Sequence, residues 1–135
     1  MLVVDANVVA YLLIDGDKTV QAHDLWAIDH DWRAPRLLFY ELGNVFAQLV
    51  KQRAISLEAG IAGLESAAGL VRLHEQDPPA ARLLEIAAKL AVSACDASYL
   101  ATAEALGAPL VTEDGRLLRV APGLTRSLGS FVTGA

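Results

Sequence analysis

Two acidic residues of this sequence stand at the ends of short apolar stretches that have the composition of buried strands. Asp5 follows the β-branched run Leu2 to Val4, and Asp114 comes shortly after the stretch Pro109 to Thr112. Ligands of open α/β folds bind at the carboxyl ends of the strands, which is where such acids would lie. We therefore expect both carboxylates in one metal-binding cleft.

Two further acids interrupt the apolar faces of predicted helices. Glu41 has apolar residues one turn before and after it in a helix expected from Arg36 to about Gln52, and Asp96 lies in the first turn of a helix expected from Ser93 to Gly107. An ionised carboxylate in such surroundings is costly unless a positive charge compensates it. Two alternatives stay open: Glu41 is a partly exposed residue at the edge of the stripe, or Asp96 only stabilises the start of its helix through the helix dipole.

The four acids can meet at one place in a parallel sheet. With right-handed crossovers, the carboxyl ends of strands and the starts of the helices that follow share one edge. Four carboxylates in one cleft cannot all stay ionised unaided, and Mg²⁺ or Mn²⁺ is the expected partner because these hard cations take oxygen ligands. Zinc is not expected, since no His and Cys residues are paired at zinc spacing. Such a metal orients water and stabilises charge on a phosphate, so we predict metal-assisted hydrolysis of phosphodiester bonds.

The elements that must position these acids alternate between short apolar runs and longer helical segments, which predicts an α/β fold in one domain, residues 1–135. Asn7 is expected to cap the first helix, and Asp77 with Pro78 to open another. Besides the two helices given above, the pattern predicts helices over 7–14, 19–28, 56–68 and 80–90, a short helix after Asp114, and strands over 32–35, 70–73 and from 125, before a Gly-rich tail.

The bulk composition excludes several classes of protein. With 54% apolar residues and a mean hydropathy of +0.39, the chain is not disordered. Its longest helical stretch, Pro78 to Gly107, is interrupted by five charged residues, so no membrane span is expected. A single cysteine, Cys95, cannot form an internal disulfide, which favours a cytoplasmic location. The net charge of −5 indicates that any nucleic acid is held locally or through metal ions.

The same residues resemble the PIN-domain family and, within it, the VapC-type toxins of bacterial toxin–antitoxin pairs. The resemblance covers nearly the whole chain, and its strength comes from the order and spacing of several short motifs rather than from any one of them. These motifs are Val3-Val4-Asp5-Ala6-Asn7, Tyr40-Glu41-Leu42 with Asn44, Cys95-Asp96-Ala97-Ser98-Tyr99-Leu100-Ala101, Gly107-Ala108-Pro109-Leu110-Val111-Thr112, and Asp114.

The resemblance implies a three-layer α/β/α domain with a parallel sheet of four or five strands, and a Mg²⁺- or Mn²⁺-dependent endoribonuclease. It also implies an RNA substrate such as tRNA, a homodimer, and a cognate antitoxin whose tail fills the active-site groove. The catalytic residues that it implies are Asp5, Glu41, Asp96 and Asp114. Asp5, Asp96 and Asp114 would bind the metal, and Glu41 would position or deprotonate the attacking water. Asn7 and Thr112 would be the supporting polar residues.

Among the basic residues, Arg116 and Arg119 follow Asp114 closely, and we expect them to contact RNA phosphates. A second cluster, with His23, Asp24, Asp29, His30 and Asp31 at one end of a predicted helix, is interpreted as a solvated surface rather than a metal site, because no further ligands follow at a fixed spacing.

Other functions remain as alternatives. A phosphatase with an aspartyl nucleophile would need a second Asp where this chain has Asn7, and a phospho-acceptor receiver would need a lysine after its last main strand, whereas no lysine follows Lys89. A degenerate relative that only binds RNA or a protein partner is the main alternative to an enzyme, and the intact set of four acids argues against it.

Overall fold

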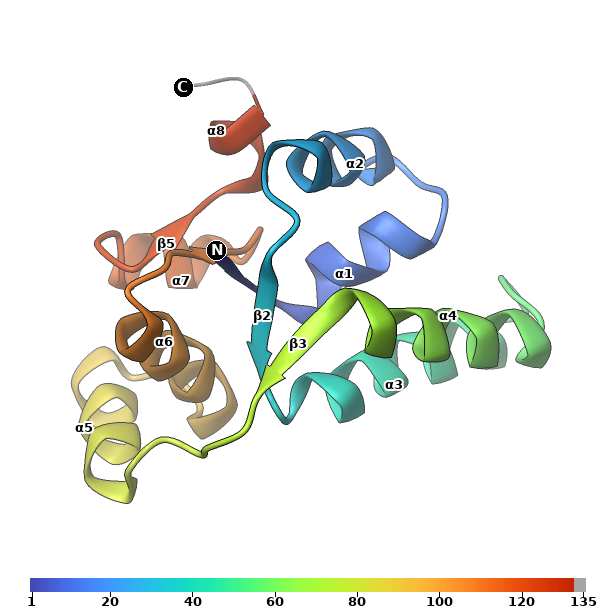
Figure 1. Ribbon diagram of the computed structural model, residues 1–135. Coiled ribbons are helices and arrows are strands. Elements are labelled where there is room, and N and C mark those ends of the chain that lie inside the picture. The colour runs from blue at the N-terminus through green and yellow to red at the C-terminus, as the bar shows by residue number, and fades with distance from the viewer. Residues whose placement is uncertain (133–135) are drawn as a thin grey trace.

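Five short parallel strands form one sheet at the centre of the computed structural model, which describes residues 1–132 (Figure 1). Their order across the sheet is β3-β2-β1-β4-β5, and every neighbouring pair is parallel. The strands are β1 (Leu2–Val4), β2 (Trp32–Pro35), β3 (Val71–His74), β4 (Leu110–Val111) and β5 (Thr125–Arg126). The prediction of an α/β fold with a four- or five-stranded parallel sheet is confirmed.

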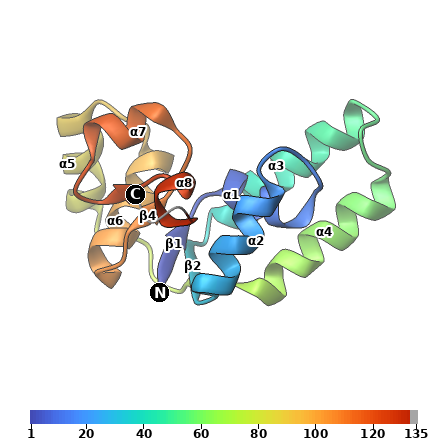
Figure 2. The same ribbon diagram turned by 90° about the horizontal axis from the view of Figure 1, so that it is seen from above.

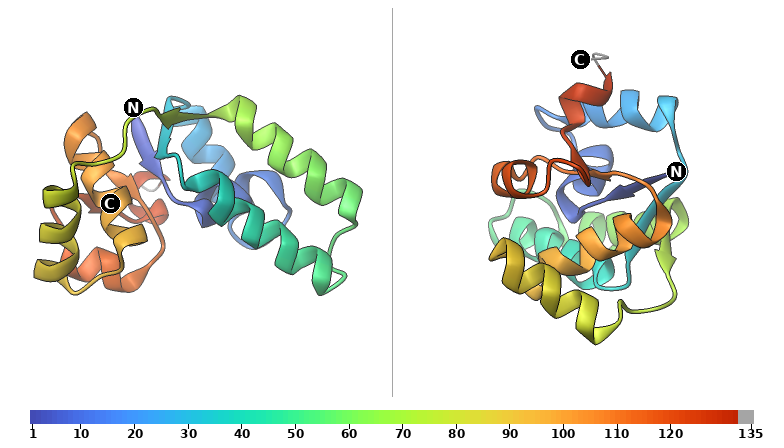
Figure 3. Two further views of the ribbon diagram at one scale, coloured as in Figure 1. Left: turned by 90° about the horizontal axis from the view of Figure 1, so that it is seen from below. Right: turned by 90° about the vertical axis from the view of Figure 1, so that its left-hand side faces the viewer.

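Helices cover both faces of the sheet. Figure 2 shows α5 and α6 on one side and α1 to α4 on the other, and Figure 3 shows the α3–α4 pair extending away from the strands. The helices are α1 (Ala6–Leu13), α2 (Thr19–Ile28), α3 (Leu38–Lys51), α4 (Leu57–Leu70), α5 (Ala80–Leu90), α6 (Ala94–Leu106), α7 (Gly115–Val120) and α8 (Leu128–Val132). This is the three-layer α/β/α arrangement that the resemblance implied.

The two central strands determine where a site can form. Val3 pairs with Leu110 and Val4 with Val111, and all four side chains are fully buried. The strand order runs outward from β1 in both directions, so the gap between the carboxyl ends of β1 and β4 is the topological switch point where open α/β sheets bind ligands. The residues that follow the paired valines, Asp5 and Thr112, leave the sheet side by side at that point.

Several local expectations were wrong. Asp5, not Asn7, caps α1, and the helix expected from Arg36 begins at Leu38. Asp77 does not cap α5: that helix begins at Ala80 without a side-chain cap, and Asp77 pairs with Arg36 at 2.5 Å instead.

The carboxyl-terminal part was only partly predicted. The expected edge strand is present as β5, but α8 follows it and packs against α2, which the sequence pattern did not indicate. The end of the Gly-rich tail, residues 133–135, lies outside the described residues, as does that part of the predicted domain. Within residues 1–132, no helix is long and apolar enough to span a membrane.

Candidate functional site

All four predicted acids line one small cavity, of about 120 Å³, at the switch point of the sheet. Asp5 comes from the end of β1, Glu41 from α3, Asp96 from α6 and Asp114 from the start of α7. The other residues that line it are Ala6, Asn7, Tyr99, Leu110 and Leu117. Larger hollows exist elsewhere on the surface, but none of those described gathers these acids. Four separate segments therefore deliver the carboxylates to one place.

A chain of hydrogen bonds fixes the two acids at the strand ends. The Thr112 hydroxyl donates to Oδ2 of Asp5 at 2.5 Å and accepts from the backbone N–H of Asp114 at 3.0 Å. The other oxygen of Asp5 accepts from the backbone N–H of Val8 at 3.0 Å, which caps α1. Oδ1 of Asp114 likewise accepts from two backbone N–H groups in the first turn of α7. Both acids thus cap a helix and also face the cavity.

Asp96 lines the cavity from the first turn of α6. Its backbone N–H donates to Oγ of Ser93, which caps α6. Its carboxylate is half-buried, and the Ser93 side chain and the charge of Arg116 both lower its pKa against the larger, opposite effect of burial. The Arg116 guanidinium donates a hydrogen bond to the carbonyl oxygen of Ala91, at the left-handed end of α5.

Glu41 lies opposite Tyr99. Glu41 is half-buried: its side chain lines the cavity and is also partly exposed, as expected at the edge of the apolar stripe. The Tyr99 phenol approaches its carboxylate and lowers its pKa, although burial has the larger effect and leaves that pKa above its ordinary value. The contact falls short of hydrogen-bond geometry, because the buried Tyr99 hydroxyl has no formed hydrogen bond among residues 1–132.

The electrostatics of the cavity favour a positive ligand. Burial raises the pKa of Asp5, Glu41 and Asp96, and repulsion from neighbouring acids raises it further in each. Hydrogen bonds from Thr112 and Val8 partly oppose this shift in the pKa of Asp5. The carboxylates are therefore more costly to ionise here than in water, and a cation in the cavity would lower that cost.

The residues present fit a hard divalent cation in their chemistry, since all four charged donors are carboxylates. Within residues 1–132, no three His, Cys, Asp or Glu side chains already stand close enough to share one ion. The side chains that line the cavity would therefore have to adjust when a cation binds. The metal role assigned to Asp5, Asp96 and Asp114 stays a prediction.

The supporting residues predicted from the sequence fall into two groups. Thr112 is fully buried and joins Asp5 to Asp114, whereas Asn7 lines the cavity but is otherwise exposed and is not the cap. Of the two adjacent acids after β4, Glu113 accepts from the backbone N–H of Leu128 and pairs with a lysine, so only Asp114 faces the cavity. Tyr99 was missed as a site residue.

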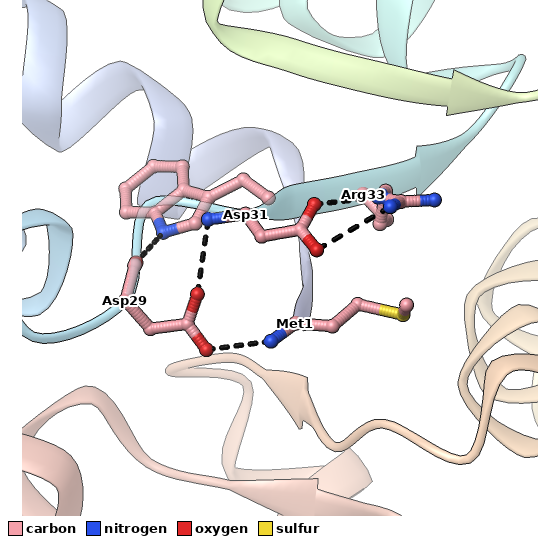
Figure 4. Close-up of polar contacts among 5 residues, drawn as sticks. Met1, Asp29, Asp31 and Arg33 are labelled. Atoms are coloured by element: carbon pink, nitrogen blue, oxygen red, sulfur yellow. Dashed lines mark hydrogen bonds and ion pairs between the residues drawn. The ribbon is translucent and has the colours of Figure 1, made fainter.

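The second acidic cluster, near the end of α2, has a structural explanation. Asp29 pairs with the amino group of Met1 at 2.7 Å, and Asp31 pairs with Arg33 at 2.7 Å (Figure 4). The indole N–H of Trp32 donates to the backbone carbonyl of Asp29 at 2.8 Å. These contacts hold the start of β2 beside β1, so Asp29 and Asp31 have structural partners.

Comparisons with known proteins agree with this arrangement. The family model described as PIN domain matches residues 2–122. A curated relative, Exonuclease VapC9 of Pyrobaculum aerophilum, is 30% identical over 115 residues, which cover 85% of this chain and 81% of that protein.

Two solved structures share the fold. The crystal structure of PAE2754 from Pyrobaculum aerophilum has a TM-score of 0.79 at 22% identity, covering 98% of this chain and 94% of that one. The structure of Mycobacterium tuberculosis VapC20, described as a sarcin-ricin loop cleaving toxin, has a TM-score of 0.66 at 20% identity and covers 90% of this chain and 95% of that one.

Proposed function

The chain belongs to the PIN-domain family, and on that premise we propose that it is a divalent-metal-dependent endoribonuclease, the toxin of a toxin–antitoxin pair. The 30% identical relative is named an exonuclease, which supports nuclease chemistry. The toxin assignment rests on the resemblance to VapC proteins, among which VapC20 is described as cleaving the sarcin-ricin loop.

One observation carries the proposal: Asp5, Glu41, Asp96 and Asp114 come from four segments and line one cavity at the switch point. Each of the four could have a structural role alone, and two of them do cap helices. Helix capping does not require the four acids to lie close together. Gathering them is costly, because each added carboxylate makes the others harder to ionise. A cavity of this kind is suited to binding cations and phosphate esters.

The residues of the chain have distinct tasks in the proposed hydrolysis. Asp5, Asp96 and Asp114 would hold Mg²⁺ or Mn²⁺, which supplies the positive charge that polarises the scissile phosphate. Glu41 orients the attacking water and accepts its proton, and its raised pKa suits a general base because it makes the carboxylate more basic. Thr112 and Val8 keep Asp5 in place by hydrogen bonds to both of its oxygens.

The basic residues beside the cavity are proposed to contact RNA. Arg116 and Arg119 are exposed on α7, whose first turn is capped by Asp114. Contacts from these two side chains would hold phosphates locally, as a chain with a net charge of −5 requires.

The proposal extends to assembly and location. A homodimer, a cognate antitoxin that covers the site and a cytoplasmic location all come from the resemblance and the composition. Exposed apolar side chains on α3 and α4, among them Phe39, Leu57 and Ile61, offer surface for such contacts. Light scattering of the purified chain tests the dimer.

The experiment is cleavage of a pool of tRNA and rRNA, including a sarcin-ricin loop RNA, by the purified chain free of antitoxin. Wild-type protein with Mn²⁺ or Mg²⁺ is expected to give discrete fragments, and EDTA to abolish them. Asp96→Asn should also abolish them, because it removes a charge from the cavity without touching a cap. Asp24→Asn, an exposed acid on α2, is the matched control and should cleave normally.

A circular RNA separates the two kinds of nuclease. Cutting of a closed circle requires an endonuclease, whereas an exonuclease leaves it intact and shortens only the linear form. If neither RNA is cut by folded protein and the divalent cation does not raise the melting temperature, the non-catalytic binding module becomes the better explanation.

A further inference from the structure

Tyr99 lines the cavity together with the four acids, but the proposed function gives its hydroxyl no role. Its side chain is only 3% exposed, on the same helix as Asp96 and one turn beyond it. Its hydroxyl is fully buried and has no formed hydrogen bond among the described residues. A buried polar group without a partner is costly and rare in folded proteins, so a phenylalanine would fit this position better if packing were its only role.

The surroundings of the hydroxyl restrict its partner. It lies in the lining of the acidic cavity, and the carboxylate that approaches it is that of Glu41. Asp5 acts on it only through its charge. A neutral phenol can donate one hydrogen bond to a carboxylate, and burial together with the neighbouring acids raises its pKa, which keeps the proton on the oxygen.

We propose that Tyr99 is a positioning residue, whose hydroxyl holds the Glu41 carboxylate in the cavity by donating a hydrogen bond to it. Glu41 extends from α3 on one side of the sheet, whereas Tyr99 and Asp96 extend from α6 on the other. The contact is therefore the link between the general base and the helix that carries a proposed metal ligand. Among residues 1–132, the Glu41 carboxylate has no hydrogen bond or ion pair with any other side chain.

This inference rests on the proposed function for the meaning of Glu41, and it predicts a specific change in kinetics. Tyr99→Phe removes the hydroxyl and keeps the ring, so the packing of α6 is preserved. A less well-placed base slows the chemical step, and we expect kcat for RNA cleavage to fall by about tenfold while KM stays unchanged. Tyr40→Phe is the matched control: it makes the same change in a 75% exposed residue next to Glu41 and should leave kcat unchanged.

A second measurement needs neither RNA nor metal. The chain contains seven glutamates, so ¹³C labelling of glutamate carboxyl groups gives few signals, and the signal missing in Glu41→Gln identifies Glu41. In Tyr99→Phe that one signal is expected to move, because its neighbouring donor is gone, while the other glutamate signals stay in place. Tyr40→Phe should move none of them.

The two measurements separate the possible failures. If the wild-type protein cleaves RNA but Tyr99→Phe leaves both kcat and the Glu41 signal unchanged, the positioning role is wrong and the nuclease remains. If the wild-type protein does not cleave RNA but the Glu41 signal moves in Tyr99→Phe, the contact is confirmed and the proposed function fails. A change in melting temperature alone, with kcat and the signal unchanged, would assign Tyr99 to packing and overturn the proposal.

Discussion

The hydroxyl of Thr112 donates a 2.5 Å hydrogen bond to the carboxylate of Asp5, across 107 positions of the sequence. The parallel register of β1 and β4 produces this contact, because Val4 is opposite Val111 and the next residues of both strands emerge together. The same hydroxyl accepts the backbone N–H of Asp114. One buried threonine thus ties two of the four cavity acids to the end of the sheet.

Replacing Thr112 by valine is expected to impair both stability and activity. Valine keeps the shape but leaves the backbone N–H of Asp114 without its acceptor and Asp5 without one donor, which costs about 1–3 kcal/mol. Urea unfolding and RNA cleavage measure the two effects. Thr112→Ser keeps the hydroxyl and should retain most of both. Equal behaviour of the two variants would contradict a role for the hydroxyl.

The buried acids predict that the metal-free protein loses stability as the pH rises. In the folded protein the pKa values of Asp5, Glu41 and Asp96 lie above their unfolded values, which are 3.8 for Asp and 4.5 for Glu. At a pH between the unfolded and the folded pKa, the folded state therefore binds more protons than the unfolded state. Their contribution to the free energy of unfolding is therefore fully present below the unfolded pKa, and it is lost as the pH rises through the folded pKa. Thermal unfolding in EDTA from about pH 5 to about pH 7 measures it.

Two variants check the origin of this pH dependence. Asp5→Asn removes one buried acid and retains an acceptor for the cap, so it should flatten the dependence. Asp29→Asn should not flatten it, because the pKa of Asp29 is lowered and its contribution is lost only at lower pH. A melting temperature that rises between mild acid and neutrality would show that the buried acids do not dominate.

Mg²⁺ or Mn²⁺ is expected to reverse this loss at neutral pH. A ligand that binds only the folded state raises the melting temperature, and a cation binds best where the carboxylates are ionised. The rise should therefore be larger at about pH 7 than at about pH 5, and Asp96→Asn should reduce it. Calorimetric scans with increasing Mn²⁺ provide the measurement. An equal rise in the wild type and the variant would place the cation elsewhere.

The convergence of the acids was predictable because alternating short apolar runs and helical segments indicate a parallel sheet, and the carboxyl ends of parallel strands share one edge. The capping roles were harder to predict. Asp5 and Asn7 are both good capping residues, and only the point where β1 ends decides that Asp5 takes the role. Tyr99 was counted as an apolar neighbour of Asp96, although its position three residues later placed its hydroxyl on the same face.

Contacts between distant segments explain the remaining misses. Asp77 before Pro78 is a strong local signal for a helix start, but its carboxylate pairs with Arg36, 41 residues earlier, and α5 begins later. The helix α8 has no clear local signal, and it is held by packing on α2 and by the hydrogen bond from Leu128 to Glu113. Local sequence patterns do not contain such information.

Asp114 offers a test that separates its structural role from its chemical one. Asp114→Asn keeps an oxygen for the N–H groups of Arg116 and Leu117, so we expect the stability to stay near that of the wild type while RNA cleavage is lost. Asp114→Ala removes the cap as well and should cost about 1 kcal/mol of unfolding free energy in addition. Asparagine that retains full cleavage would show that Asp114 is only a cap.

The last prediction concerns Arg116, whose guanidinium lies on the carbonyl of Ala91 beside Asp96. A single neutral carbonyl is a weak partner for an arginine, so a phosphate of bound RNA should replace it. Arg116→Ala is expected to weaken RNA binding and to reduce the salt slope of log K by about 1, in a background of Asp96→Asn that prevents cleavage. Arg82→Ala is the control, because Arg82 is already paired with Glu104. Fluorescence anisotropy at several salt concentrations gives both quantities, and an unchanged slope in Arg116→Ala would exclude a phosphate contact.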